Sequence, residues 1–391
     1  MCYGATLGPP ERYDMTTERA PNPSAPNRVA PAPDGARLKF GSDGSFQREL
    51  RRRVEVYFRD SGQRERDCPQ MYFKTAVILA TLVASYVLLV FFVNTWWQAL
   101  PAAMMLGAAI GCIGFNIMHD GGHQAYSDHP WINRLTAMSL DLVGASSHIW
   151  RWKHAVFHHM YVNVRGYDSD TDLGAMARLN PHQPRLWVQR FQHWYIWLLY
   201  GVMVIRWQFY GDFRDLAAGH IGEQPFRRPR GWALAQLVAF KLLFLVLAFG
   251  IPLLFHSFAM VALTYVGTMA IVGVALSLVF QLAHCVEEAE FPLPNTESGR
   301  IDNAWAIHQI ETTVNFARNN RLLCWLLGGL NFQIEHHLFP RICHVNYPAL
   351  SRVVEQTCRD FGIRYREHRS FLAGIASHFR WMRQMGRPAA A

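Results

Sequence analysis

The chain has 391 residues, of which 51% are apolar and 17% are charged, and it carries a formal net charge of +9 at pH 7. A basic balance can indicate nucleic-acid binding. Here the apolar residues gather in runs long enough to cross a bilayer, so the basic residues are better explained as topology signals and contacts to lipid headgroups, and we expect no nucleic-acid partner. The seven cysteines are scattered and form no CxxC pair, which argues against a disulfide framework.

The N-terminal part of the chain precedes any apolar run. Residues 1–40 are rich in Pro, Ala, Asn and Arg without periodicity, which predicts a disordered tail in which Met1 or Met15 is the start. No signal peptide is expected, because the first apolar run comes too late. Residues 41–72 form a second segment, in which residues 44–60 have helical spacing and a basic face. They predict a cytoplasmic amphipathic helix lying before the membrane or, about equally, an ordinary solvated helix.

Four runs are long enough to span a bilayer, which takes about 20 apolar residues. They cover residues 73–93, 98–118, 232–255 and 258–282, and short connections join them as two hairpins. Apolar stretches at 135–150 and 193–210 are interrupted by polar residues, and we interpret them as helices that pack against the spans or lie among the headgroups. The prediction is an all-α integral membrane domain over residues 73–370, with a C-terminal tail at 371–391.

Charge indicates the orientation of these spans. Of the 38 Lys and Arg residues, 12 precede residue 73, 12 lie at 119–230 and 12 follow residue 284. Only Lys74 and Lys241 remain, in or beside spans, and the two short turns contain none. Because cytoplasmic loops carry the positive excess, both termini and the central loop should be cytoplasmic.

Histidines gather beside the ends of the spans. A lone histidine is usually a hydrogen-bonded core residue, but residues three or four apart on a helix share a face, and the clusters HDGGH, HAVFHH and QIEHH therefore present convergent donors. Imidazole suits zinc, copper, iron and nickel. One zinc ion takes about four ligands, so the set favours two metals, with His158 and His159 on different ones. The candidate ligands are His119, His123, His154, His158, His159, His284, His336 and His337.

Several neighbours of these histidines are candidates for supporting roles. Gly121 and Gly122 allow the close approach of a metal, a helix or a substrate, although they also fit a helix end. Asp120 and Glu335 are candidate hydrogen-bond partners of imidazole N–H groups, or simply solvated carboxylates. His308 is a further candidate, with a substrate or structural role favoured. His129, His148, His182 and His344 have no comparable support.

Different classes of function fit a histidine-rich site at a membrane. Oxidation of unactivated methylene groups needs a strong oxidant, such as an iron species formed from dioxygen. A membrane zinc hydrolase would need fewer ligands. A metal transporter would place its ligands within the spans along a pathway, whereas these cluster on one side.

The three clusters and their surroundings resemble a known family. HDGGH, HAVFHH and QIEHH, with YVNVRGYDSDTD and GGLNFQIEHHLFP around the second and third, resemble the histidine boxes of membrane fatty acid desaturases over residues 38–370. Gln333, where the third box usually has its first histidine, is similar to the front-end desaturases, which act between an existing double bond and the carboxyl end. Related di-iron lipid hydroxylases, carotenoid ketolases and sphingolipid desaturases share similar boxes.

The resemblance implies a helical cap over the spans that holds two iron ions on the eight histidines, with Gln333 as a ninth, weaker ligand or an orienting group. It implies that O2 is consumed and that a cis double bond forms in an acyl chain, carried by CoA or a lipid, in a narrow tunnel. Trp150, Trp152, Trp305 and Phe332 are candidate tunnel residues. Front-end enzymes often carry a fused cytochrome b5 domain with an HPGG motif, which is not found here. We therefore expect electrons from a separate ferredoxin, or from cytochrome b5 with its reductase.

Overall fold

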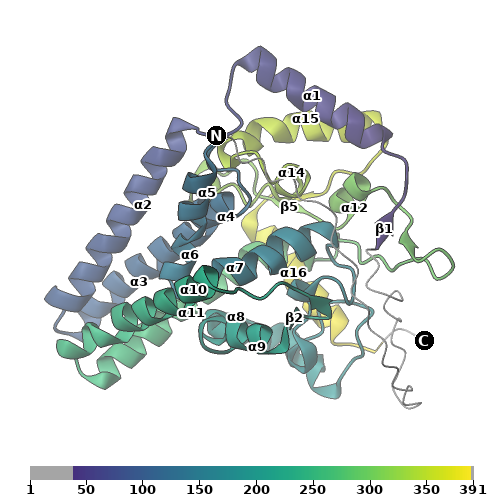
Figure 1. Ribbon diagram of the computed structural model, residues 1–391. Helices are drawn as coiled ribbons and strands as arrows, with labels where there is room; N and C mark the ends of the chain where they lie inside the picture. Colours follow the sequence, from purple (N-terminus) through teal and green to yellow (C-terminus); the bar gives the residue numbers. More distant parts are fainter. Residues whose placement is uncertain (1–37, 389–391) are drawn as a thin grey trace. The chain divides into compact units, whose positions relative to one another are not determined.

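The computed structural model describes residues 38–388 (Figure 1). The disordered tail predicted for residues 1–40 therefore lies almost wholly outside the described residues. Its last residues do not fit that prediction, because Lys39–Phe40 form strand β1, which pairs in parallel with β4 (Arg300–Ile301). The side chain of Leu38 is buried in a small apolar cluster with Val164 and Ile301.

The four predicted spans are present as helices long and apolar enough to cross a membrane, at Pro69–Phe92, Trp96–Gly122, Trp232–Leu254 and Phe258–His284. Most contain several helical segments, in which η marks a π- or 3₁₀-helix. These segments are α2 (Pro69–Val87), η2 (Leu88–Phe92), α3 (Trp96–Cys112), η3 (Ile113–Met118), α4 (His119–Gly122), α10 (Trp232–Leu245), η9 (Val246–Gly250), η10 (Pro252–Leu254) and α11 (Phe258–His284). Pro69 lies in the first turn of α2, where its missing N–H is not needed.

The spans are not equally enclosed by protein. Within the most apolar stretch of each, 56% of the residues of the second span and 50% of those of the fourth are buried, against 17% and 11% for the first and third. The second and fourth spans therefore form the inner pair, and α11 packs against α3 and α8. These inner spans end in His119–Gly122 and in His284, so the best-enclosed helices carry candidate ligands at their ends.

The segments outside the spans, residues 38–68, 123–231 and 285–388, are called the cap here. Its central part contains α5 (Pro130–Ala137), α6 (Ser139–Leu142), α7 (Ser147–Trp150), η4 (Arg151–His158), η5 (Ser169–Thr171), η6 (Gly174–Met176), η7 (Trp187–Phe191), α8 (Gln192–Arg206), η8 (Trp207–Gly211), α9 (Asp212–Ala218) and the antiparallel strands β2 (His220–Ile221) and β3 (Gln224–Pro225). As predicted for residues 193–210, α8 packs against the spans: Ile196 and Tyr200 are buried, while Trp194 and Leu198 face outward.

The C-terminal part of the cap covers the ends of the inner spans. It contains α12 (Trp305–Glu311), α13 (Arg321–Leu326), α14 (Gln333–Leu338), η11 (His344–Asn346), α15 (Tyr347–Asp360), α16 (Phe371–Met385) and the parallel strands β5 (Asn315–Phe316) and β6 (Glu367–His368). Helix α16 packs against α8 and α11, with Trp381 and Met382 buried. The folded part therefore continues past residue 370, into the segment predicted as a C-terminal tail.

The predicted amphipathic helix is present as α1 (Ser45–Ser61), but its apolar face is covered by protein. Phe46, Leu50, Val54 and Phe58 repeat at helical spacing and are all buried in one cluster with residues of α12, α14 and α15. Figure 1 shows α1 lying along α15. The apolar face of α1 is therefore occupied by protein. The sequence pattern identified the apolar face but could not say what covers it.

Candidate metal centre

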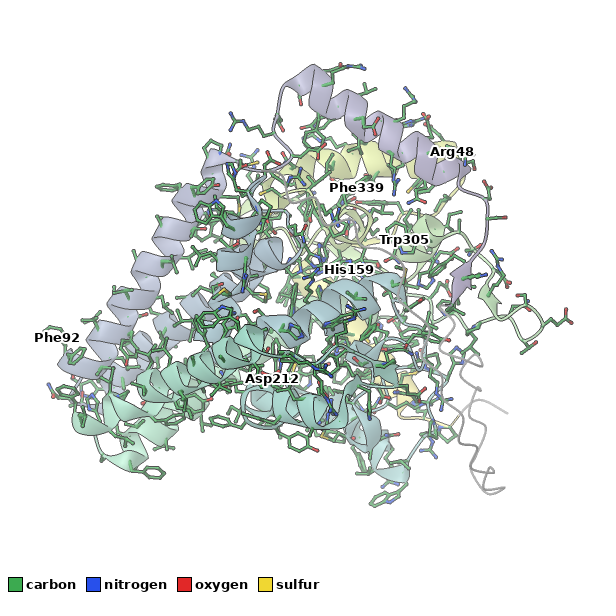
Figure 2. The ribbon with its side chains drawn as sticks, in the orientation of Figure 1. Arg48, Phe92, His159, Asp212, Trp305 and Phe339 are labelled. Atoms are coloured by element: carbon green, nitrogen blue, oxygen red, sulfur yellow. The ribbon has the colours of Figure 1, made fainter. Side chains whose placement is uncertain are left out.

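The structure brings all eight predicted histidines together at the ends of the inner spans. Their side-chain nitrogens form three overlapping groups, within each of which one nitrogen per residue lies within 4.8 Å of the others. The groups are His119, His123, His154 and His336; then His158, His284 and His337; then His159, His336 and His337. Figure 2 labels His159, which lies in the interior of the fold between the spans and the cap. Helical spacing predicts that His158 and His159 serve different metals, and the structure places them in different groups.

Local backbone geometry produces this convergence. His154 and His158 of the second cluster lie on η4, a π-helix, instead of the expected α-helix, and His159 follows it directly. The imidazole rings of His154 and His158 stack with centroids 5.1 Å apart. π-Helical turns are rare and concentrate at functional sites. Ser146 caps the preceding turn, because its side chain accepts a hydrogen bond from the Ile149 N–H. This cap fixes the start of α7, which continues directly into the helix that carries the cluster.

Five histidines have their Nδ1 atom beside a polar partner. Nδ1 of His158 donates to Asp168 (3.0 Å), that of His337 to the Gln309 amide (3.0 Å) and that of His284 to the Thr312 carbonyl (3.2 Å). His336 Nδ1 lies 3.4 Å from the Tyr347 hydroxyl, and His154 Nδ1 lies 3.8 Å from Asp170. A proton held on Nδ1 leaves Nε2 unprotonated, which is the form that binds a metal.

The donor atoms that remain fit a pair of metal ions. Within residues 38–388, the Nε2 atoms of His123, His158, His284, His336 and His337 are buried and have no hydrogen-bond partner. Buried polar atoms without partners are rare, because each costs about 1–3 kcal/mol. A metal ion satisfies several at once, and a set of imidazoles without thiolates suits iron, zinc, copper or nickel.

The electrostatics of the site favour neutral imidazoles. Burial lowers the pKa of His123, His159, His336 and His337 well below 6.5, and neighbouring histidines lower it further. His158 differs: burial would lower its pKa, but the Asp168 carboxylate more than reverses this effect. Neutral imidazole is the metal-binding form, so the group as a whole is prepared to bind cations.

Two of the predicted supporting carboxylates have other partners. Asp120 accepts hydrogen bonds from the backbone N–H (3.2 Å) and the imidazole (2.9 Å) of His344, whose Nε2 atom accepts a hydrogen bond from Lys74 (3.0 Å). Glu335 accepts hydrogen bonds from Asn315 and Tyr365 (both 2.8 Å), and burial raises its pKa to about 7. Neither carboxylate bonds a candidate ligand in the structure, and neither is solvated, because both are buried.

Some of the remaining predicted residues lie at the histidine groups, and others pack elsewhere. Gln333 is buried on α14, three and four residues before His336 and His337. His308 is buried outside the metal-binding groups and packs against Phe40. Among the candidate tunnel residues, Trp150 contacts the rings of His119, His123 and His154 at 4.8–5.7 Å between centroids. Trp305 and Phe332 pack in the cluster beneath α1, and Trp152 packs against Phe157.

The two glycines of the first cluster allow close packing by protein. A Cβ atom on Gly121 would lie 2.2 Å from Thr136 Oγ1 and 2.6 Å from the Ala137 nitrogen, both on α5. A Cβ on Gly122 would lie 2.2 Å from the Trp150 ring. Of the neighbours expected for these glycines, the structure shows a helix and an aromatic ring.

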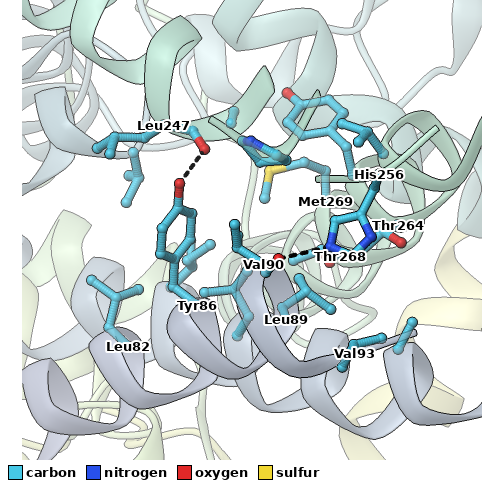
Figure 3. Close-up of a pocket in the computed structure, with 18 of the residues that line it drawn as sticks. Leu82, Tyr86, Leu89, Val90, Val93, Leu247, His256, Thr264, Thr268 and Met269 are labelled. Atoms are coloured by element: carbon cyan, nitrogen blue, oxygen red, sulfur yellow. Dashed lines mark hydrogen bonds between the residues drawn. The ribbon is translucent and has the colours of Figure 1, made fainter. Parts of the chain in front are cut away.

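An apolar pocket lies among the spans (Figure 3). It has a volume of about 320 Å³, and Tyr86, which lines it, donates a hydrogen bond to the Leu247 carbonyl (2.8 Å). Val143 also lines the pocket and packs in one apolar cluster with Trp150. Continuous apolar contacts therefore lead from the histidines to the pocket.

Comparison with known proteins identifies the family. Residues 94–369 match the family model described as fatty acid desaturase. The chain belongs to the fatty acid desaturase family. This desaturase is 39% identical over 352 residues to the sn-1 linoleoyl-lipid 6-desaturase of Synechocystis sp., covering 90% of this chain and 98% of the relative.

Two further relatives agree with this assignment. The sn-1 linoleoyl-lipid 6-desaturase of Arthrospira platensis is 35% identical and covers 90% of this chain and 95% of the relative. The acyl-lipid (8-3)-desaturase of Physcomitrium patens is also 35% identical, over 87% of this chain and 72% of the relative. The desaturase is therefore an oxidoreductase that acts on fatty acyl chains, and its four apolar helices associate it with the membrane.

The sequence did not predict which residues hydrogen-bond to the candidate ligands. Asp168 and Asp170 lie in the segment YDSDTD, which contributes to the resemblance but does not by itself assign a role to either carboxylate. Gln309, Thr312 and Tyr347 are separated from their histidines by 28, 28 and 11 positions. The available signal was acidic: Asp168 follows His158 by 10 positions, and Asp170 lies two residues further on.

Proposed function

We propose that the eight histidines hold two iron ions and that the enzyme uses O2 to introduce a cis double bond near the carboxyl end of an acyl chain carried by a membrane lipid. The observation that carries the proposal is the convergence of five buried, unpartnered Nε2 atoms in overlapping groups. The front-end position and the lipid carrier are supported by Gln333 in the third cluster and by relatives named as linoleoyl-lipid 6- and acyl-lipid (8-3)-desaturases.

Bound iron would supply the activation of dioxygen that unactivated methylene groups require. Two adjacent C–H bonds are broken, and O2 with two electrons and two protons from outside the substrate becomes two molecules of water. The protein's own residues orient the candidate ligands and enclose the site. Asp168, Gln309 and the Thr312 carbonyl fix imidazole orientation, and the complete burial of His158, His284 and His337 excludes bulk water. Gln333 would complete the set as a weak ligand or as an orienting group.

The methyl end of the acyl chain would extend toward the pocket among the spans. Trp150 covers one side of the histidines, and its apolar cluster reaches Val143 at the pocket wall. An enzyme that acts near the carboxyl end must accommodate most of the acyl chain beyond its metals. The pocket's apolar lining within the bilayer suits that part of the substrate.

The topology and electron supply complete the proposal. By the positive-inside rule, both termini and the cap are cytoplasmic, which gives the metal centre access to soluble reductants. We propose ferredoxin, or cytochrome b5 with its reductase, as a separate electron donor. A basic face on the cap would favour an acidic partner.

The proposal is tested by expressing the chain in a host supplied with defined fatty acids and locating new double bonds by mass spectrometry. We expect a new cis double bond between an existing one and the carboxyl end. His158→Ala, His284→Ala and His336→Ala should each abolish this product while the protein remains in the membrane. Hydroxylated products would assign the enzyme to the related lipid hydroxylases, and normal unsaturation in all three variants would refute the ligand set.

A further inference from the structure

Asn163 lies in the turn that follows the second histidine cluster, and its side chain is completely buried. Its backbone has a left-handed conformation, with a φ of 59°. Asparagine is one of the few residues with a side chain that tolerate this conformation. The Asn180 side chain donates a hydrogen bond to the Asn163 carbonyl (3.0 Å), which holds the turn from its other side.

The backbone of Asn163 shares an acceptor with a candidate metal ligand. Its N–H donates to Oδ2 of Asp168 (3.0 Å), the same oxygen that accepts the hydrogen bond from Nδ1 of His158 (3.0 Å). Asp168 is buried, so its carboxylate has little access to water. A fixed N–H on this oxygen therefore holds the carboxylate in the position from which it orients the imidazole.

The side chain of Asn163 contacts the segments around a second candidate ligand. Its Nδ2 atom donates to the backbone carbonyls of His284 and Glu290 (both 3.0 Å) and lies 3.4 Å from the carbonyl oxygen of Thr312. The Thr312 carbonyl also accepts the hydrogen bond from Nδ1 of His284 (3.2 Å). Three carbonyl oxygens around one atom identify it as the NH2 group of the amide, because an oxygen there would be repelled.

These contacts connect the partners of one complete histidine group, called the Asn163 group here. The group consists of His158, His284 and His337. Gln309, which orients His337, lies on α12 three residues before Thr312, the residue that ends this helix. Asn163 thus joins the loop that contains Asp168 to the end of α12, although Thr312 is 149 positions away in sequence.

The other large group, called the Trp150 group here, is oriented less firmly. It consists of His119, His123, His154 and His336. Within residues 38–388, the polar partners at Nδ1 in this group are Asp170, 3.8 Å from His154, and the Tyr347 hydroxyl, 3.4 Å from His336. Both distances exceed the 3.0–3.2 Å found in the Asn163 group. Because such partners raise the metal affinity of an imidazole, the two groups should bind metal with different strength.

We propose that Asn163 is a positioning residue that preorganises the Asn163 group, so that the metal ion held there binds more tightly than the one held by the Trp150 group. The inference rests on the proposed function and specifies the order in which its metal centre is filled. Asn163 acts through the Asp168 carboxylate and through the backbone of His284 and Thr312. Loss of its side chain should therefore weaken one metal site and leave the other unchanged.

The test measures how metal ions leave the purified full-length holoenzyme. The protein is equilibrated without oxygen against increasing concentrations of an iron chelator, and the iron retained per chain is quantified by mass spectrometry. We expect two release steps in the wild type. His123→Ala, in the Trp150 group, should remove the step at low chelator concentration, and His284→Ala, in the Asn163 group, should remove the step at high concentration.

Asn163→Gly retains the left-handed backbone and its N–H but removes the amide. It should weaken only the more tightly bound metal, by about 10- to 100-fold, and so move the second step to lower chelator concentration. Asn163→Asp also tolerates the backbone conformation and replaces the NH2 group with an oxygen among the three carbonyls. It should shift the same step, and it serves as the second variant if the glycine form does not fold.

Gln192→Ala is the matched control. Gln192 is a buried amide that donates to two backbone carbonyls, those of Arg178 (2.8 Å) and Met382 (3.0 Å), and it lies outside the histidine groups. Its loss should lower the unfolding temperature and leave both release steps in place. A single release step in the wild type, unchanged release in both Asn163 variants, or an equal shift of both steps would overturn the positioning role while the two-metal centre stands. Wild-type protein that holds fewer than two irons would instead refute the proposed function.

Discussion

Replacing Asp168 by Asn tests how far the metal centre depends on the residues around its ligands. Oδ2 of Asp168 accepts hydrogen bonds from His158 Nδ1 and the Asn163 N–H (both 3.0 Å), and Oδ1 accepts one from the Asp170 N–H (2.9 Å). An amide has only one oxygen. If that oxygen faces His158, the NH2 group faces another donor, and the opposite orientation directs the NH2 group at the imidazole.

The expected loss is about 10- to 100-fold in activity or metal affinity, equivalent to about 1.4–2.8 kcal/mol. It is measured as turnover of a defined lipid and as iron per chain in the purified enzyme. Asp170→Asn should have a smaller effect, because Asp170 lies 3.8 Å from His154 and also pairs with Lys153 at 2.9 Å. Asp302→Asn is the exposed control. Full turnover with full iron content in D168N would refute the view that Asp168 orients His158.

The remaining predictions concern stability, measured as thermal unfolding of the solubilised protein. Lys241→Met should lower the free energy of unfolding by about 3–5 kcal/mol, because it removes the charge partner of the buried Asp212 carboxylate, which lies 2.7 Å from Lys241. Adding D212N should recover part of this loss. No recovery would contradict a charge effect. Gly121→Ala should lower the free energy of unfolding by about 1–3 kcal/mol. The loss should be clearly larger than for Gly114→Ala, where the new Cβ meets its nearest atom at 3.4 Å. Equal losses would mean that close packing at Gly121 does not limit stability. Burial lowers the pKa of His378 to about 4, so the unfolded chain takes up a proton first, near pH 6.5, and acidification from there to pH 4 should cost the wild type up to about 3 kcal/mol. His378→Gln should lack this part of the pH dependence. If stability falls with pH equally in the variant and the wild type, His378 is not its source.

The sequence predicted the parts of the fold that depend on local pattern. The four spans follow from the length of their apolar runs, and the clusters HDGGH, HAVFHH and QIEHH converge because each lies on one helical segment beside a span end or folded over it. His284 could be placed in the site because it ends the fourth span. These arguments need only helix geometry and the thickness of a bilayer.

What the sequence could not predict depends on contacts between distant segments. Helix α1 has an evident apolar face, yet nothing in its own residues indicates that α15 covers it. Asp120 lies between two ligand candidates but faces His344, which is 224 positions away and had no assigned role. Adjacency in sequence was a poor guide here, because on a helix successive side chains point in different directions.

The same limit applies to the end of the domain. Residues 371–385 continue as α16, whose Trp381 is buried and donates a hydrogen bond to the Leu179 carbonyl (2.9 Å). Its partner lies 202 positions earlier, in a loop without regular periodicity. The local sequence of this segment therefore does not show whether it is a tail or a packed helix, because its packing depends on a residue far away in the chain.

Metal content measured on active protein is the most direct test of the central claim that eight histidines hold two metal ions. The full-length chain is purified from the membrane, its turnover is measured, and its metals are quantified by mass spectrometry. The proposed function predicts about two irons per active chain and a large loss of iron in His158→Ala and His336→Ala. Stoichiometric zinc in fully active protein, or unchanged iron in both variants, would contradict the account.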